Sequence, residues 1–180
     1  NISIRPLEIN GGRQAVVTGN SFNNFVTGQH DNPVLIYDGF SPTSTEQVVT
    51  LKDNTFNYGS NANIYPVVIG AGCKINEDIT SPTITFSTDY PAAYRYIVLS
   101  RGVGYLNNYR NAVWGDAGIP YLLASEITIT GTDASNKSSL TIKPGVTVCM
   151  GDGSGFDNLA VRGDLTAIGT AAKPITFTKK

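Results

Sequence analysis

Carboxylates are the residues in this sequence with the clearest potential for chemistry. Two carboxyl groups a few ångströms apart hydrolyse glycosidic bonds, and carboxylates that hold calcium beside a base suit a polysaccharide lyase. The nearest approach to a cluster is Asp31, Asp38, Asp53, Glu77 and Asp78, which are scattered along the chain. Asp53 precedes Asn54, at what we expect to be a solvated bend. We therefore predict no catalytic residue and do not expect an enzyme.

Metal ligands are sparse. A zinc site needs about four ligands, and the one histidine, His30, lies in a stretch whose composition indicates an exposed loop. Residues 152–159 (Asp-Gly-Ser-Gly-Phe-Asp-Asn-Leu) come close to a calcium-binding nonapeptide, but that motif works in tandem copies. A single copy favours an ordinary glycine-rich bend. No metal or cofactor is predicted, and calcium near Asp152 and Asp157 stays an open alternative.

Aromatic residues gather in one part of the chain. Aromatic rings stack on sugar faces, and tyrosine and tryptophan are also enriched at protein interfaces. We favour a cap or an interface, with a carbohydrate groove as the alternative. The set, which falls within 32 residues, is Tyr90, Tyr94, Tyr96, Tyr105, Tyr109, Trp114 and Tyr121.

The composition argues against two classes of partner. The chain has 180 residues, a formal charge of −1 and only 15% charged residues, against about 25% in an average soluble protein. The absence of a basic run argues against nucleic acid. The absence of a long apolar stretch argues against membrane insertion, which takes ~20 residues for a helix.

The two cysteines, Cys73 and Cys149, leave two alternatives open. They lie 76 positions apart, and a disulfide between them is one possibility. Buried thiols in the core are the other, because free cysteine often behaves as a small apolar residue.

Short alternating apolar runs predict the elements that would position these residues. Glycine and proline turns separate the runs, so the strands are too closely spaced for a sandwich of long hairpins. Strands of this kind stack as rungs of a coil, each on the strand one turn earlier. The runs are Leu140–Ile142, Val146–Val148, Leu159–Val161 and Ile175–Phe177.

A repeat of about 34 residues supports the coil in the first part of the chain. Asn20 and Asn54 recur 34 positions apart, as do Phe22 and Phe56, and Pro33 and Pro66 recur 33 apart. Two landmarks at nearly one period are typical of repeat architectures. We expect the asparagines to stack at one bend and the phenylalanines to stack inside.

The predicted organisation has three parts: coil turns in residues 1–90, a junction or cap in 91–118, and a second coil segment in 119–180. Residues 100–118 break the pattern and indicate an irregular crossover. Helical signals are thin, and a short helix around Ala92–Tyr96 is the one candidate.

Residues 114–178 resemble the opening turns of right-handed parallel β-helix proteins of bacterial cell surfaces, a pectate-lyase-like group that includes adhesins. The resemblance implies a right-handed parallel β-helix. The segments that carry it are Trp114, Pro120-Tyr121, Ile127–Ile129, Leu140–Gly145, Val161–Gly163, Leu165–Ala167, Gly169-Thr170 and Pro174–Thr178.

The resemblance implies an extracellular or cell-surface role. We expect a structural or adhesive module whose partners are neighbouring β-helical subunits or domains, with glycans as an alternative partner. An opening pattern lies at the end of this chain, so it is either a segment of a longer coil or a subunit that joins head to tail into a filament. A polysaccharide-binding or polysaccharide-degrading domain is the alternative function.

Overall fold

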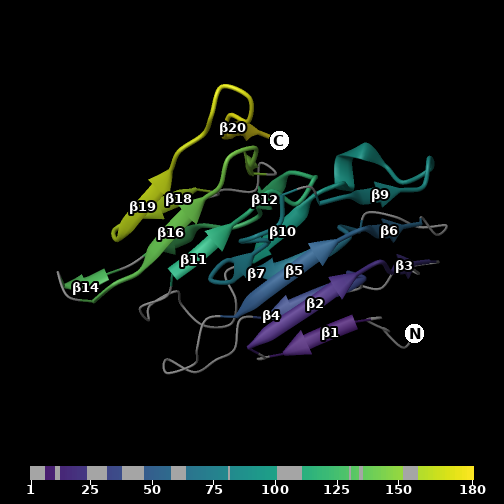
Figure 1. Ribbon diagram of the computed structural model, residues 1–180, viewed down its shortest axis with the longest axis horizontal. Coiled ribbons are helices and arrows are strands. Elements are labelled where there is room, and N and C mark those ends of the chain that lie inside the picture. Colours follow the sequence, from purple (N-terminus) through teal and green to yellow (C-terminus); the bar gives the residue numbers. More distant parts are fainter. Residues whose placement is uncertain are drawn as a thin grey trace.

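The computed structural model is a parallel β-solenoid with almost no helix (Figure 1), as the pattern of short apolar runs predicts. The structure describes residues 7–10, 13–23, 32–37, 47–57, 64–80, 82–100, 111–129, 131–133, 136–151 and 158–180. Within these ranges the single helical element is a 3₁₀ turn, η1 (Ala92–Tyr94), inside the segment expected to hold a short helix. No helix in the described ranges is long and apolar enough to cross a membrane.

One sheet, which we call sheet A, runs the length of the coil. Its strands are parallel, and they place Val67, Ile97, Tyr121 and Val148 in one inward row that is almost completely buried. In order across the sheet, the strands are β1 (Leu7–Asn10), β4 (Val34–Tyr37), β7 (Val67–Gly70), β10 (Ile97–Ser100), β12 (Tyr121–Leu123), β17 (Thr147–Met150) and β20 (Thr176–Lys179).

A second parallel sheet, sheet B, forms the facing wall. Alternation decides which side chains enter the core: β2 buries Ala15 and Val17, and β5 buries Val49 and Leu51. Its strands are β2 (Gln14–Thr18), β5 (Val48–Lys52), β8 (Lys74–Ile75), β11 (Asn111–Trp114), β16 (Ser139–Ile142) and β19 (Asp164–Ala167).

The third wall changes position along the coil. In the first part, sheet C follows sheet B in each turn and contains β3 (Ser21–Phe22), β6 (Asn54–Phe56) and β9 (Ile84–Phe86). In the later part, sheet D precedes sheet B and contains β13 (Ile127–Ile129) and β18 (Leu159–Val161). An antiparallel pair, β14 (Gly131–Asp133) and β15 (Asn136–Lys137), lies between β13 and β16.

Sheets A and B continue through the region where this change occurs. Trp114 belongs to β11, which pairs with β8 on one side and β16 on the other. The irregular crossover expected over residues 100–118 therefore contains a regular strand. The apolar run Ala112–Trp114 indicates this strand, but the glycines and asparagines around the run suggested an irregular segment. The division at residues 91–118 stays a prediction.

The sequence repeat corresponds to stacked turns. Val34 is in register with Val67, and Phe22 with Phe56. The rings of Phe22 and Phe56 are stacked and nearly parallel, with centroids 5.0 Å apart. Phe86 continues the stack on the other side of Phe56 at 6.0 Å. The predicted internal phenylalanine stack is confirmed, and it extends to a third turn.

Both cysteines are buried and neither forms a disulfide, and they lie in different apolar clusters. Cys73 belongs to the core enclosed by the sheets. Cys149 belongs to a smaller cluster with Val98 and Leu122. Val98 pairs with Leu122, and Leu122 pairs with Cys149. All three side chains lie on the opposite face of sheet A from the buried Tyr121 row.

Candidate assembly interface

The last turn of the coil presents open strand edges. Within the described ranges, β18 pairs only with β13, β19 only with β16, and β20 only with β17. An unpaired edge carries a row of backbone N–H and C=O groups that can bind another strand. Figure 1 shows β19 and β20 at one end of the stack and β1 at the other.

Apolar side chains that would be core residues in any earlier turn are exposed at this end. Leu165 is 43% exposed, whereas its register partner Leu140 is 1% exposed. Phe177 is 48% exposed, whereas its partner Val148 is 0% exposed. Val161 in β18 is likewise exposed and is in register with the buried Ile129. We call Val161, Leu165 and Phe177 the end row.

Local geometry holds the last turn against the turn before it. Gly163 precedes β19, and a Cβ at this position would lie 2.2 Å from the backbone oxygen of Ser138. Only glycine allows this approach, so the corner between β18 and β19 sits directly on the preceding turn. The connection from β19 to β20 closes with a turn in which Thr170 N–H donates to the Lys173 carbonyl at 3.0 Å.

At the N-terminal end of the coil, the core-facing residues are less exposed. Strands β1, β2 and β3 also have one partner each among the described residues. However, the inward residues of β2, Ala15 and Val17, are each only 3% exposed. Exposed apolar residues of the core-facing row therefore concentrate at the C-terminal end of the coil.

Of the candidate carboxylates, the structure describes Asp53, Glu77 and Asp78, and each of these lies beside a lysine or faces solvent. Asp53 lies at a bend with a positive φ of 55° and is half exposed beside Lys52, 3.7 Å away. Glu77 lies 3.8 Å from Lys74, and Asp78 is exposed. No group of three or more potential metal ligands occurs in the part of the chain that the structure describes. His30, Asp31, Asp38, Asp152 and Asp157 lie outside the described residues.

The aromatic set divides between the core and the surface. Trp114 and Tyr121 are buried in the coil, where Trp114 Nε1 donates to the Ala71 carbonyl at 3.0 Å and Tyr121 Oη to the Gly115 carbonyl at 2.6 Å. Tyr90 is also buried. These three rings offer no face to a sugar.

Tyr94 and Tyr96 are partly buried at the surface, and they contact Tyr65, which the sequence reasoning missed. Tyr65 and Tyr96 lie just before β7 and β10, one coil period apart. This spacing in the sequence could have identified Tyr65 as a member of the aromatic group. Tyr105 and Tyr109 lie outside the described residues.

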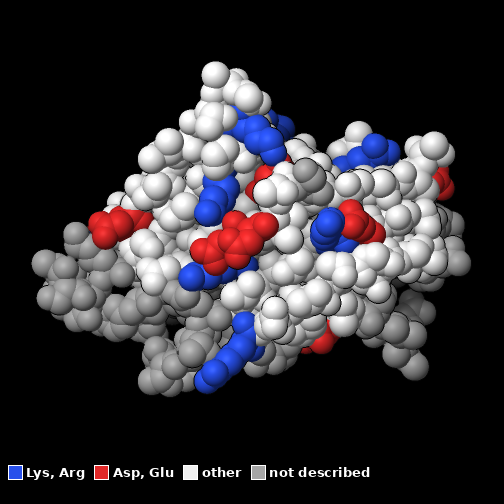
Figure 2. All heavy atoms as spheres, viewed as in Figure 1, with Lys and Arg blue, Asp and Glu red and all other residues white. Residues whose placement is uncertain are grey.

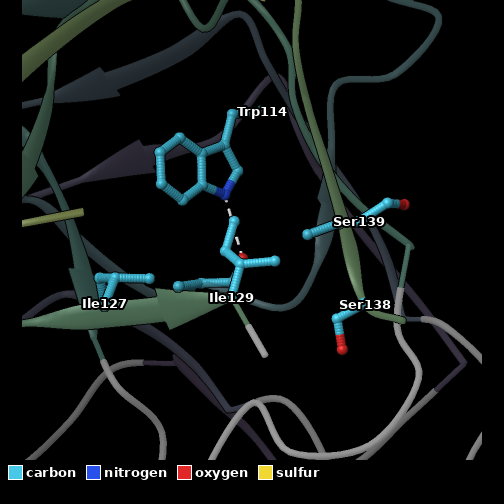
Figure 3. Close-up of a pocket in the computed structure, with 7 residues that line it drawn as sticks. Trp114, Ile127, Ile129, Ser138 and Ser139 are labelled. Carbon is cyan, nitrogen blue, oxygen red and sulfur yellow. Dashed lines mark hydrogen bonds between the residues drawn. The ribbon is translucent and has the colours of Figure 1, made fainter. Parts of the chain in front are cut away.

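A small cavity lies beside Trp114 (Figure 3). It has a volume of ≈ 10 Å³ and is lined mainly by apolar residues, including Ile127 and Ile129. This volume is at the lower limit for one water molecule. Ser138 Oγ, which also lines the cavity, is buried without a protein hydrogen-bond partner. The cavity is too small for a substrate and suits a bridging water.

Among the described residues, burial perturbs two titratable groups. Burial raises the pKa of the Tyr121 hydroxyl above its ordinary value, and the Asp116 carboxylate adds to the effect. Burial also raises the pKa of the Cys149 thiol, and the Lys180 ammonium partly offsets this. Both groups therefore stay neutral at ordinary pH, so neither is an activated nucleophile or base.

Surface charge is sparse and mixed in sign. Figure 2 shows acidic and basic side chains next to one another on an otherwise uncharged face. Comparison of the chain with protein-family models, with curated proteins and with solved structures found no match. The fold defines the class of protein at the level of a parallel β-solenoid.

Proposed function

We propose that this chain is a structural or adhesive module of the extracellular surface, of the bacterial pectate-lyase-like kind that its sequence resembles, and that it joins end to end with further copies. The exposed end row carries this proposal. Leu165 and Phe177 occupy positions that are fully buried one turn earlier. A further turn with apolar inward residues would bury them, and burial of apolar surface favours association.

A second copy is the occupant that the sheet geometry favours. All strands of sheet A run in one direction, as do those of sheet B. Among the described strands, β1 and β20 are the outermost strands of sheet A, so β20 on one copy and β1 on the next would match in direction as neighbours in a parallel sheet. Such a contact joins two different surfaces and does not close on itself, so repetition makes a filament.

Sedimentation velocity over a range of concentrations, with electron microscopy of the same samples, tests the proposal. We expect the wild-type chain to elongate as its concentration rises and to form fibres. Leu165→Lys should stay monomeric, because it places a charge where the next turn must pack. Thr166→Lys is the matched control, since its side chain lies on the opposite face of the same strand.

The Thr166→Lys variant should assemble like wild type. Far-UV circular dichroism of both variants checks that the coil is intact. A wild-type chain that sediments as a monomer at the highest attainable concentration would rule out end-to-end joining. Equal assembly of Leu165→Lys and wild type would rule out the end row as the interface.

Glycan binding is a second candidate, because Tyr65, Tyr94 and Tyr96 gather partly exposed on one surface. Affinity electrophoresis in gels that contain neutral polysaccharides tests this function. Retardation that Tyr94→Ala abolishes would support it. Unchanged mobility across the polysaccharides tested would count against it.

A further inference from the structure

Three tyrosine rings surround one ammonium group at the surface. Lys180 Nζ lies 5.0 Å from the centroid of Tyr65 and 5.7 Å from the centroids of Tyr94 and Tyr96. It also donates a hydrogen bond of 2.6 Å to Tyr65 Oη. We call the three tyrosines the tyrosine cage.

The coil builds the cage from consecutive turns. Tyr65 lies before β7 and Tyr96 before β10, and these strands are neighbours in sheet A, which brings the two rings together. Tyr94 is the last residue of η1. Its ring meets Tyr65 edge to face at 5.4 Å, and Tyr96 meets Tyr65 in the same manner at 6.5 Å.

A cluster of buried apolar residues supports the tyrosine rings. Tyr65 and Tyr96 pack on Val98, Leu122 and Cys149, all of which are at most 7% exposed. The rings are therefore held in place by burial on one side while part of each remains at the surface. This arrangement fixes the binding geometry before a ligand arrives, which lowers the entropy cost of binding.

The chemistry of the cage suits one kind of ligand. The faces of aromatic rings carry partial negative charge and attract cations within about 6 Å. The Tyr65 hydroxyl oxygen also accepts a hydrogen bond from the bound nitrogen. We propose that the tyrosine cage is a binding site for a protonated primary amine, and that Lys180 occupies it as an internal competitor. Lys180 is itself exposed, so it can leave without disturbing the core.

Titration with n-butylammonium, followed by NMR, tests this site independently of assembly. Because the faces of tyrosine rings shift nearby protons upfield, the ligand methylene next to nitrogen should report entry. Lys180→Gln removes the competitor and should bind about two- to fivefold more tightly than wild type. Lys179→Gln, which changes the preceding lysine, should bind like wild type. The neutral n-butanol should show no such shift with any variant.

Two further measurements separate the cage from nonspecific binding. In the Lys180→Gln background, Tyr65→Phe keeps the ring and removes the acceptor. It should weaken n-butylammonium binding and leave tetramethylammonium, which has no N–H to donate, unchanged. Glucosamine carries the same ammonium on a sugar ring, so comparing it with n-butylammonium distinguishes an amino sugar from a lysine side chain as the source.

Binding of either amine that depends on the cage supports the proposal. The proposal is wrong if the emptied cage binds neither amine. It is also wrong if Lys179→Gln and Lys180→Gln raise the affinity equally. Melting curves of every variant confirm that the coil remains folded during the titrations.

Discussion

Asn54 holds Asn20 across one full turn of the coil. Asn54 Oδ1 accepts hydrogen bonds from both the backbone N–H of Asn20, at 3.1 Å, and its side-chain amide, at 3.2 Å. The Asn54 side-chain amide in turn donates to the Val17 carbonyl at 2.7 Å. One buried amide therefore satisfies groups at the corner where the chain leaves sheet B for sheet C.

Asn54→Ala should destabilise the protein substantially. It would leave the buried Val17 carbonyl and the Asn20 N–H without these partners, which we expect to cost about 2–4 kcal/mol. Urea unfolding followed by circular dichroism measures the change. Asn57→Ala is the control, because Asn57 makes a comparable amide bond to Asn23 at an exposed site. It should cost less than about 1 kcal/mol, and equal costs would refute the role of burial.

Phe56→Ala should be among the most damaging core substitutions. Phe56 is 1% exposed and stacks between Phe22 and Phe86, so we expect a loss of about 3–5 kcal/mol. Phe177→Ala removes an equal side chain that is 48% exposed and should cost under about 1.5 kcal/mol. Thermal or urea unfolding of dilute, monomeric samples compares them. A larger loss at Phe177 would contradict the exposed end row.

Gly115→Asn should destabilise far more than Gly19→Asn. A Cβ at Gly115 would lie 2.2 Å from the Asn76 backbone oxygen, whereas nothing lies within 4 Å at Gly19. The first change forces two turns apart, at about 1–3 kcal/mol or more. Gly19 has a φ of +68°, which asparagine tolerates better than most residues. The free energies of unfolding of the two variants decide the matter, and similar values would argue against close backbone stacking.

Alkaline pH should weaken the fold through Tyr121. Because its folded pKa is raised, the unfolded chain loses this proton first, and stability falls as pH rises above about 10 by up to ~1.4 kcal/mol per unit. Below about pH 10, the contribution of Tyr121 to the free energy of unfolding is fully present. Tyr121→Phe should be less stable at pH 7, where it lacks the bond to Gly115. Urea unfolding at pH 8–11 should show the gap between the two proteins narrowing, and a constant gap would contradict the prediction.

Local periodicity was enough to predict the repeating parts of the fold. The recurrence of Asn20 at Asn54 and of Phe22 at Phe56 predicted stacking that the structure shows. The runs Leu140–Ile142 and Leu159–Val161 fall within strands β16 and β18, whereas Val146–Val148 and Ile175–Phe177 each begin one residue before strands β17 and β20. These predictions hold because identical side chains at one period occupy equivalent positions in successive turns.

Packing between residues far apart in the sequence could not be predicted. Trp114 looked like a surface or junction residue by its neighbours in sequence, yet β8 and β16 enclose its strand on both sides. Likewise, no local pattern joins Lys180 to Tyr65 or to Tyr94. Residues of different types from separate turns share no repeat, so only the closed coil brings them together.

The sequence by itself therefore determined that this protein is a coil of parallel strands, because the alternation of apolar residues and the length of the repeat can be read directly from it. The tertiary structure decided which residues face solvent. Leu165 and Leu140 have the same side chain on the same face of sheet B, yet one is 43% exposed and the other 1%. The difference is that β19 stacks on the strand of Leu140, whereas no described strand stacks on the far side of β19, and no residue type encodes this neighbourhood.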